Sequence, residues 1–214
     1  MTRLPFYFSW LRFATLLRVI EGKPSNGQKN REPDQELVSR TLADKQSFTA
    51  LVRRYDDPLL RYILRMGWKD AATAQDLLQE IFIKTYVNLN DYDPSLPFSS
   101  WIYRIAHNEI VSAFRKEKVR PFVLKKETDF FLFETIVDDA GLHQDDGRKF
   151  SAAEIQVAVN RLEAKYRDII VLKFFEEKSY EEISDILQMP QGTVATLINR
   201  AKKKIRESLE KNHR

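Results

Sequence analysis

The sequence predicts an all-α protein: two small helical domains joined by an acidic linker, the C-terminal one containing a helix-turn-helix. Apolar residues recur at spacings of three and four over residues 34–118 and again over 151–214, which indicates amphipathic helices. The intervening residues 119–150 break this pattern. A chain of 214 residues is also long enough for two domains that each bury a core.

The composition excludes several classes of site. With 43% hydrophobic and 31% charged residues, and only 6 Gly and 8 Pro, the chain is typical of a folded protein. It has no Cys, so disulfides, thiolate nucleophiles and cysteine-ligated zinc are excluded. The three histidines, His107, His143 and His213, lie far apart and show no metal-ligand spacing. We therefore expect no cofactor and no metal.

Residues 1–33 are interpreted as an N-terminal leader. The first 20 are apolar and aromatic, but Arg12 and Arg18 interrupt them, so the run is too short and too charged for a membrane-spanning helix. A small-residue cleavage site for a signal peptide is missing. The leader is interpreted either as an amphipathic helix that lies on a membrane or partner, or as a disordered segment.

The N-terminal domain, residues 34–118, begins with an apolar stripe interrupted by Pro58, where we expect a kink. The stripe consists of Phe48, Leu51, Val52, Tyr55, Leu59 and Ile63. A second helix is predicted over residues 73–89. At 100° per residue its apolar positions point one way, and Asp76, Gln79 and Glu80 point the other way. The sequence thus predicts a partly acidic, exposed patch.

A loop over residues 90–100 is followed by a helix over residues 101–116. The loop carries two prolines and, unusually for a loop, Tyr92 and Phe98. The core-facing positions of the helix are Ile102, Ala106, Ile110, Ala113 and Phe114. A separate stripe consists of Trp101, Arg104, Asn108, Ser112 and Arg115, and Lys116 continues it into a basic end.

Residues 119–150 are predicted to be a linker. Between Glu127 and Asp146 there are seven acidic residues and no Lys or Arg. Three phenylalanines in the same stretch argue against a purely solvated tether.

The C-terminal domain, residues 151–214, opens on a capping box at Ser151–Glu154, and a second box at Ser179–Glu182 starts a later helix. Residues 179–205 are typical of a helix-turn-helix with its turn at 189–192.

The second helix of this unit divides into two faces. Its predicted buried positions are Val194, Ile198, Ala201, Ile205 and Leu209. Its predicted outward positions are Thr196, Asn199, Arg200 and Lys203. Such polar side chains can reach base edges and phosphates in a DNA major groove, and the basic run over 200–206 adds attraction to the backbone. A helical hairpin with a solvated basic end remains the alternative interpretation.

The helix-turn-helix segment resembles the −35-binding domain of bacterial sigma factors. DLLQEIF (76–82) and PFSSWIYRIAHNEI (97–110) resemble their promoter-melting domain. The order and spacing resemble the extracytoplasmic-function (ECF) group of the sigma-70 family over about residues 35–210. Two departures stand out: Ser112 lies where the family usually has Asp, and Ala195 and Leu197 lie where it usually has basic residues.

The resemblance implies a role for each predicted surface. Asp76, Gln79 and Glu80 would dock on core RNA polymerase, with a merely solvated helix side as the alternative. The −10 promoter element would be bound by Phe98, Trp101, Arg104, Asn108, Arg115 and Lys116, and the −35 element by Thr193, Thr196, Asn199, Arg200 and Lys203. The alternative for Phe98 and Trp101 is that both rings belong to the core of the small domain. The linker would thread through the polymerase.

These roles imply a cytoplasmic transcription initiation factor that recognises promoter DNA and helps open it, with no catalysis of its own and no small-molecule substrate. The resemblance also implies an anti-sigma inhibitor, which in many relatives is membrane-bound and would hold the chain at the inner membrane face.

Three other functions remain open. A helix-turn-helix regulator that acts without polymerase would explain residues 179–205, but it gives no role to the Asp76 face. An enzyme is disfavoured because a glycine-rich phosphate loop and a nucleophile triad are both missing. A membrane-surface protein would depend on the leader, so that deleting residues 1–30 would abolish its behaviour.

Overall fold

The computed structural model describes residues 32–68, 70–117 and 150–211, and within these ranges every regular element is a helix. Nearly all of the predicted leader and of the linker lie outside the described residues. The chain forms two compact units, Met1–Asp57 and Pro58–Arg214, and each is described below by itself. The predicted division into 34–118 and 151–214 stays a prediction.

In the first unit, helix α2 (Asp34–Ala43) is followed by the short 3-10 helix η1 (Lys45–Ser47) and by the start of α3 (Phe48–Arg65). Asp44 caps η1, because its carboxylate accepts hydrogen bonds from the Gln46 amide and the Ser47 hydroxyl. Asp34 at the start of α2 pairs with Arg54 and accepts a hydrogen bond from Tyr55 on α3. The apolar core consists of Leu37, Val38, Phe48, Leu51, Val52 and Tyr55.

The second unit begins inside α3, which runs through Pro58 as one helix. All six residues of the predicted apolar stripe on this helix are buried, as the 3.6-residue period requires. Helix α4 (Ala71–Val87) starts where the Asp70 carboxylate accepts a hydrogen bond from the Thr73 amide. It therefore begins and ends two residues earlier than predicted, and the 3-10 helix η2 (Leu89–Asp91) follows it.

Helix α5 (Phe98–Glu117) packs against α4 and starts three residues before the predicted position. The Pro97 carbonyl accepts hydrogen bonds from the amides of Ser100 and Trp101, which opens the helix here. Proline is favourable at a helix start because its fixed φ suits the first turn and its missing N–H would have no partner there. Phe98, expected in a loop, therefore belongs to the first turn of α5.

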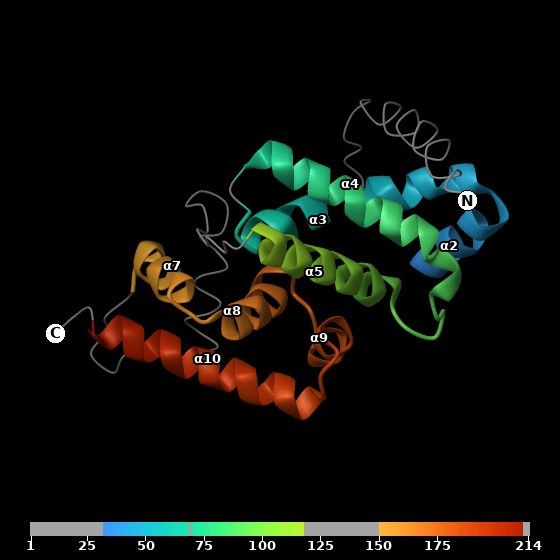
Figure 1. Cartoon of the computed structure of the whole chain (residues 1–214). Coiled ribbons are helices and arrows are strands. Elements are labelled where there is room, and N and C mark those ends of the chain that lie inside the picture. The colour runs from blue at the N-terminus through green and yellow to red at the C-terminus, as the bar shows by residue number, and fades with distance from the viewer. Residues whose placement is uncertain (1–31, 69, 118–149, 212–214) are drawn as a thin grey trace. The chain divides into compact units, whose positions relative to one another are not determined.

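The C-terminal helices pack around one long helix, α10 (Gln191–Lys211). Figure 1 shows α10 in red beside α7 (Ala152–Asn160), α8 (Ala164–Ile170) and α9 (Tyr180–Leu187), and it contacts all three. A five-residue π-helix, η3 (Val171–Phe175), continues α8. Both predicted capping boxes are confirmed: Ser151 with Glu154 starts α7, and Ser179 with Glu182 starts α9.

Searched over the described residues, no helix is both long enough and apolar enough to cross a membrane.

Candidate nucleic-acid interface

Helices α9 and α10 form the predicted helix-turn-helix, with a turn at Gln188–Pro190. Gln188 ends α9 in the left-handed conformation (φ 52°), and its side-chain amide donates to the Asp185 carbonyl at 2.6 Å. The Ser184 hydroxyl donates to the Met189 carbonyl at 2.6 Å, which fixes the next residue of the turn. Gln191 and Gly192, expected in the turn, form the start of α10 because the Pro190 carbonyl already accepts the first helical hydrogen bonds.

The two predicted faces of α10 are confirmed. Val194, Ile198, Ala201, Ile205 and Leu209 are all fully buried. Thr193, Thr196, Asn199, Arg200 and Lys203 are all exposed. Because this polar stripe follows the helix at spacings of three and four residues, its side chains stand on one side of α10. That side can enter a DNA groove while the opposite side stays anchored in the domain.

The basic run over 200–206 is not uniformly available for DNA. Lys204 forms an ion pair with Glu163 at 3.2 Å, and its ammonium group lies 5.3 Å from the centre of the Tyr166 ring. Hydrogen bonds from Lys165 and Lys204 hold the pKa of the Glu163 carboxyl below its usual value. Lys203 instead points away from the domain core, with the exposed stripe.

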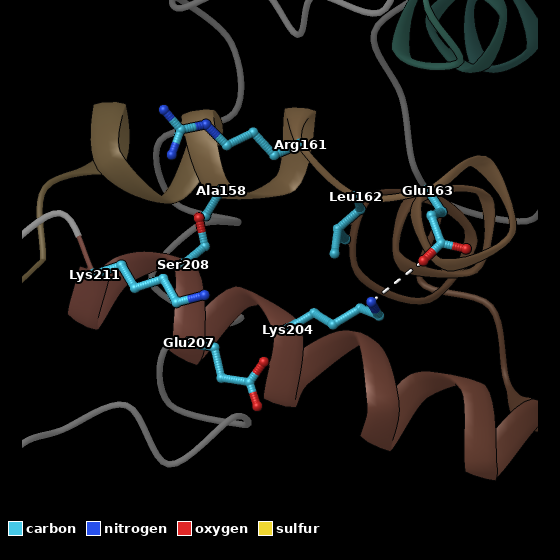
Figure 2. Close-up of a pocket in the computed structure, with 8 residues that line it drawn as sticks. All are labelled: Ala158, Arg161, Leu162, Glu163, Lys204, Glu207, Ser208 and Lys211. Carbon is cyan, nitrogen blue, oxygen red and sulfur yellow. Dashed lines mark ion pairs between the residues drawn. The ribbon is translucent and has the colours of Figure 1, made fainter.

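A shallow pocket lies between α7 and the last turns of α10, and the Lys204–Glu163 ion pair closes one end of it (Figure 2). Its lining mixes the cations Arg161, Lys204 and Lys211 with two carboxylates. The three cations exceed the two carboxylates by a single charge, so the pocket offers no concentrated field for an anionic ligand.

Helix α5 carries the second predicted DNA-binding surface. Some of its predicted residues are accessible in the structure and others are buried. Asn108, Arg115 and Lys116 are exposed and Arg104 is half-buried, so these four can reach a nucleic acid strand. Phe98 and Trp101 are only 1% and 6% exposed. The expectation that these two rings touch DNA does not fit this conformation.

Phe98 and Trp101 are part of an aromatic cluster with Tyr92. Their ring centres lie 5.2 to 5.5 Å from one another. The Tyr92 hydroxyl donates to the Leu96 carbonyl at 2.6 Å, so the cluster also fixes the loop that precedes α5. Tilted and edge-on aromatic packing of this kind stabilises a small domain core. The sequence pattern did not distinguish this role because a buried aromatic and a base-stacking aromatic are the same residue type.

The third predicted surface lies on α4. Asp76, Gln79 and Glu80 are exposed, whereas Leu77, Leu78, Ile81 and Phe82 on the other side of the helix are buried. Polar, partly anionic side chains on an exposed helix face can bind a basic protein surface. One turn further on, Lys84 pairs with Glu109 of α5 at 2.6 Å, which fixes α4 on its neighbour.

Metal chemistry has no visible site in the part of the chain that the structure describes. Among residues 32–68, 70–117 and 150–211 no three His, Asp or Glu side chains are placed to share a cation. His107 is engaged with Tyr62, whose hydroxyl lies 3.0 Å from Nδ1 of the imidazole.

Comparison with known proteins matches the segments that carry both predicted DNA-binding surfaces to one family. The Sigma-70 region 2 model matches residues 51–120, and the Sigma-70 region 4 model matches residues 152–205. The ECF RNA polymerase sigma factor SigW of Bacillus subtilis is 35% identical over 171 residues, which covers 78% of this chain and 90% of that relative. The RNA polymerase sigma-H factor of Pseudomonas aeruginosa is 34% identical over 188 residues, which covers 84% of this chain and 95% of that relative.

Solved structures show the same fold. CnrH, in complex with the cytosolic domain of CnrY, superposes with a TM-score of 0.60 at 22% identity and covers 84% of this chain and 98% of its own. The sigma factor RpoE in complex with the anti-sigma factor NepR from Bartonella quintana gives a TM-score of 0.54 at 20% identity, over 77% of this chain and 98% of its own. With matched region 2 and region 4 models and relatives at about one third identity over most of their length, this chain belongs to the ECF group of the sigma-70 family.

Proposed function

We propose that the chain binds core RNA polymerase, recognises the −35 and −10 elements of its promoters and helps to open the DNA between them. The observation that carries this proposal is the division of α10 into a fully buried apolar face and an exposed face of Thr193, Thr196, Asn199, Arg200 and Lys203. A helix anchored in this way can present polar side chains to a major groove without disturbing its own domain.

We assign the recognition of the −10 element to helix α5. Arg104, Asn108, Arg115 and Lys116 offer cations and an amide to an unpaired strand. Phe98 and Trp101 act indirectly, because their buried rings fix the loop before α5 and the first turn of the helix. The bases of an opened strand would meet that loop rather than the rings themselves.

We assign the binding of core polymerase to the exposed face of α4 that carries Asp76, Gln79 and Glu80. The chain acts in the cytoplasm, contributes no catalysis and uses no small-molecule substrate. An anti-sigma protein is its proposed inhibitor, and a membrane anchor on that protein would hold the complex at the inner membrane face. The complex of RpoE with NepR supports an inhibitor of this kind by similarity of fold.

Co-elution with core RNA polymerase tests the central step. We compare the wild type with a variant that carries Asp76→Arg and Glu80→Arg, and we expect the reversal to abolish binding. The matched control carries Glu36→Arg and Glu210→Arg, which changes the net charge equally at two exposed sites outside α4. Far-UV circular dichroism verifies that both variants keep their helices.

If the wild type itself fails to co-elute with core polymerase, the initiation-factor function is wrong. The leading alternative is then a helix-turn-helix regulator that binds duplex DNA alone. Such a regulator would bind a palindromic duplex as a dimer, which a gel-shift assay with the purified chain detects.

A further inference from the structure

The exposed side of α10 includes one position that has no side chain. Gly192 precedes Thr196, Asn199 and Lys203 at spacings of four, three and four residues, so these four positions share one side of the helix. All four are exposed, and the buried residues of α10 lie on the opposite side. Gly192 lies in the first turn of α10, which begins directly after Pro190.

The fold itself does not require a glycine at position 192. Gly192 is not among the residues with a positive φ, so its backbone conformation is open to other residues. Apart from its own helix backbone, a methyl group at this position would meet no described part of the chain within 4 Å. Glycine also destabilises a helix relative to alanine, because it loses more backbone freedom on folding. The missing side chain therefore benefits only a molecule that approaches α10 from outside.

Thr196, one turn further along the same side, has its hydroxyl group committed within the helix. The Thr196 hydroxyl donates a 2.8 Å hydrogen bond to the Gly192 carbonyl. Because its single proton is used in this bond, the oxygen can only accept a hydrogen bond from a ligand. The other branch of the side chain is a methyl group. Thr196 thus offers a ligand one acceptor and one small apolar surface.

This combination matches the edge that an A·T base pair shows in the major groove. There adenine offers its N6 amino group as a donor, and thymine offers its C5 methyl group. A G·C pair also has a donor, the N4 amino group of cytosine, but it lacks a methyl group. The methyl contact therefore discriminates between the two kinds of pair.

The side chains of this stripe become longer toward the C-terminal end of α10. Gly192 has none, Thr196 has a short one, and Lys203 has a long flexible one. In a helix-turn-helix, the N-terminal residues of the second helix contact base edges, and long basic side chains reach phosphates. The first turn of α10 can thus approach the bases most closely, with Lys203 extended toward the DNA backbone.

We propose that Gly192 is the point at which α10 comes closest to the −35 DNA, and that Thr196 recognises an A·T base pair there. The inference rests on the proposed function and adds to it a base pair and a second residue that decides the fit to DNA. It assigns the absence of a side chain at Gly192 to DNA binding and not to folding.

The variant Gly192→Ala tests the close approach with two independent measurements. Promoter duplexes are first selected by wild-type holoenzyme from a pool with a randomised upstream segment. On such a duplex, Gly192→Ala holoenzyme should bind roughly tenfold more weakly, a loss comparable to one mismatched base pair. The urea midpoint of the free variant should stay equal to that of the wild type or rise. Unchanged DNA affinity, or a lower urea midpoint, would overturn the assignment of Gly192.

Replacement of single thymines by uracil tests the base pair that Thr196 recognises. At one A·T pair of the selected −35 segment, loss of the thymine methyl should weaken wild-type binding roughly fourfold, the value for one buried methyl-sized group. Thr196→Ser lacks the methyl group and should not respond to this replacement. Thr196→Val keeps the methyl group and should respond as the wild type does. The matched control is Thr49→Ser on α3, because the Thr49 hydroxyl also donates to a backbone carbonyl.

The outcomes separate this inference from the proposed function. If the wild-type holoenzyme selects no duplex, the proposed function is wrong and the inference falls with it. If it selects a −35 segment in which no uracil replacement matters, or in which Thr196→Ser responds like the wild type, the chain is still an initiation factor. Thr196 then does not recognise an A·T pair, and the inference alone is wrong.

Discussion

The Tyr103 hydroxyl donates a 2.8 Å hydrogen bond to the carboxylate of Glu176, although 73 residues separate the two in sequence. Burial and the adjacent Glu176 carboxylate raise the pKa of the Tyr103 hydroxyl, so it remains a donor at physiological pH. Tyr103 lies on a helix of the region 2 match, and Glu176 lies in the region 4 match. The pair therefore connects two parts of the chain that the family models treat separately.

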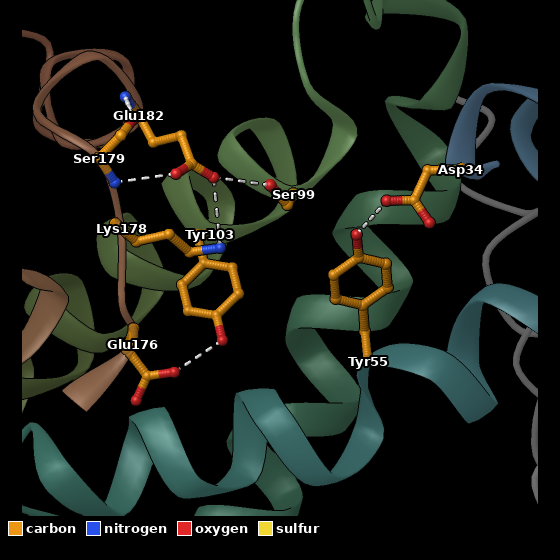
Figure 3. A network of polar contacts seen from close by, with 8 residues as sticks. All are labelled: Asp34, Tyr55, Ser99, Tyr103, Glu176, Lys178, Ser179 and Glu182. Carbon is orange, nitrogen blue, oxygen red and sulfur yellow. Dashed lines mark hydrogen bonds and ion pairs between the residues drawn. The ribbon is translucent and has the colours of Figure 1, made fainter. Parts of the chain in front are cut away.

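Glu176 and Glu182, the two carboxylates that accept hydrogen bonds from α5 (Figure 3), should respond to pH in opposite ways. Burial raises the pKa of Glu176 despite the opposing effects of Arg65, Tyr103 and Lys178. Partial burial also disfavours the charged form of Glu182, but the Ser179 backbone, Lys178 and Ser99 together hold its pKa below the usual value.

The signs follow from proton binding in the two states. The folded state binds a proton at Glu176 more tightly than the unfolded chain does, so this group favours folding more as pH falls from 7 through the carboxyl range. Glu182 stabilises the fold above its unfolded pKa and loses that contribution as pH falls. As the pH is lowered from 7 to 4, the free energy of unfolding of Glu176→Gln should therefore fall relative to that of the wild type. The free energy of unfolding of Glu182→Gln should rise relative to that of the wild type.

Thermal melting at several pH values measures these differences. The difference in melting temperature between each variant and the wild type cancels the effects of the other titrating groups. Parallel pH trends for the two variants would contradict the assignment of opposite pKa shifts.

Removal of the Ser179 cap should weaken the helix-turn-helix. The Ser179 hydroxyl accepts from the Glu182 amide at 3.1 Å, and the Glu182 carboxylate accepts from the Ser179 amide at 2.9 Å. Ser179→Ala should cost about 1 kcal/mol of unfolding free energy. Urea denaturation followed by circular dichroism checks this, with Ser39→Ala at an exposed position on α2 as the control. Equal losses in the two variants would show that the cap contributes nothing specific.

Adjacent residues on α10 should differ sharply in their effect on stability. Ile198 is fully buried, whereas Leu197 is partly exposed. Ile198→Ala should cost about 2–5 kcal/mol, since it removes buried methyl groups and leaves a cavity. Leu197→Ala should cost less than about 1 kcal/mol. Urea denaturation of both variants measures the two losses of unfolding free energy. Similar losses would show that the two faces of α10 are wrongly assigned.

Substitutions in the exposed stripe of α10 should affect two different properties, the preference for a DNA sequence and the general affinity for DNA. Asn199→Ala should lose about 1–3 kcal/mol of discrimination at one base pair, because an amide can pair with adenine in the major groove. Lys203→Ala should weaken binding to all duplexes and reduce the salt slope by about 1. Binding assays with polymerase holoenzyme at several salt concentrations measure both, with Lys45→Ala at an exposed site on η1 as the control. A uniform loss for Asn199→Ala would show that it does not read a base.

The local pattern of the sequence determined the helices and their faces. The apolar stripe on α3, the acidic face of α4, both capping boxes and the buried face of α10 were predictable, because helical period and capping act over three or four residues. Boundaries shifted by two or three residues where a local hydrogen bond decided the end, as at Asp70 and Pro97.

Tertiary structure alone decided which polar and aromatic residues meet. Phe98 and Trp101 share a residue type with DNA-stacking aromatics, and only packing against Tyr92 places them in the core. Tyr103 lies within the segment 97–110 that resembles the family, but nothing in that segment or around Glu176 indicates that the two meet. Their contact depends on the path of the intervening chain. Sequence periodicity reports burial along one helix, whereas a pairing between distant segments depends on how several helices pack together. The contact between Tyr103 and Glu176 could therefore be found only in the folded chain.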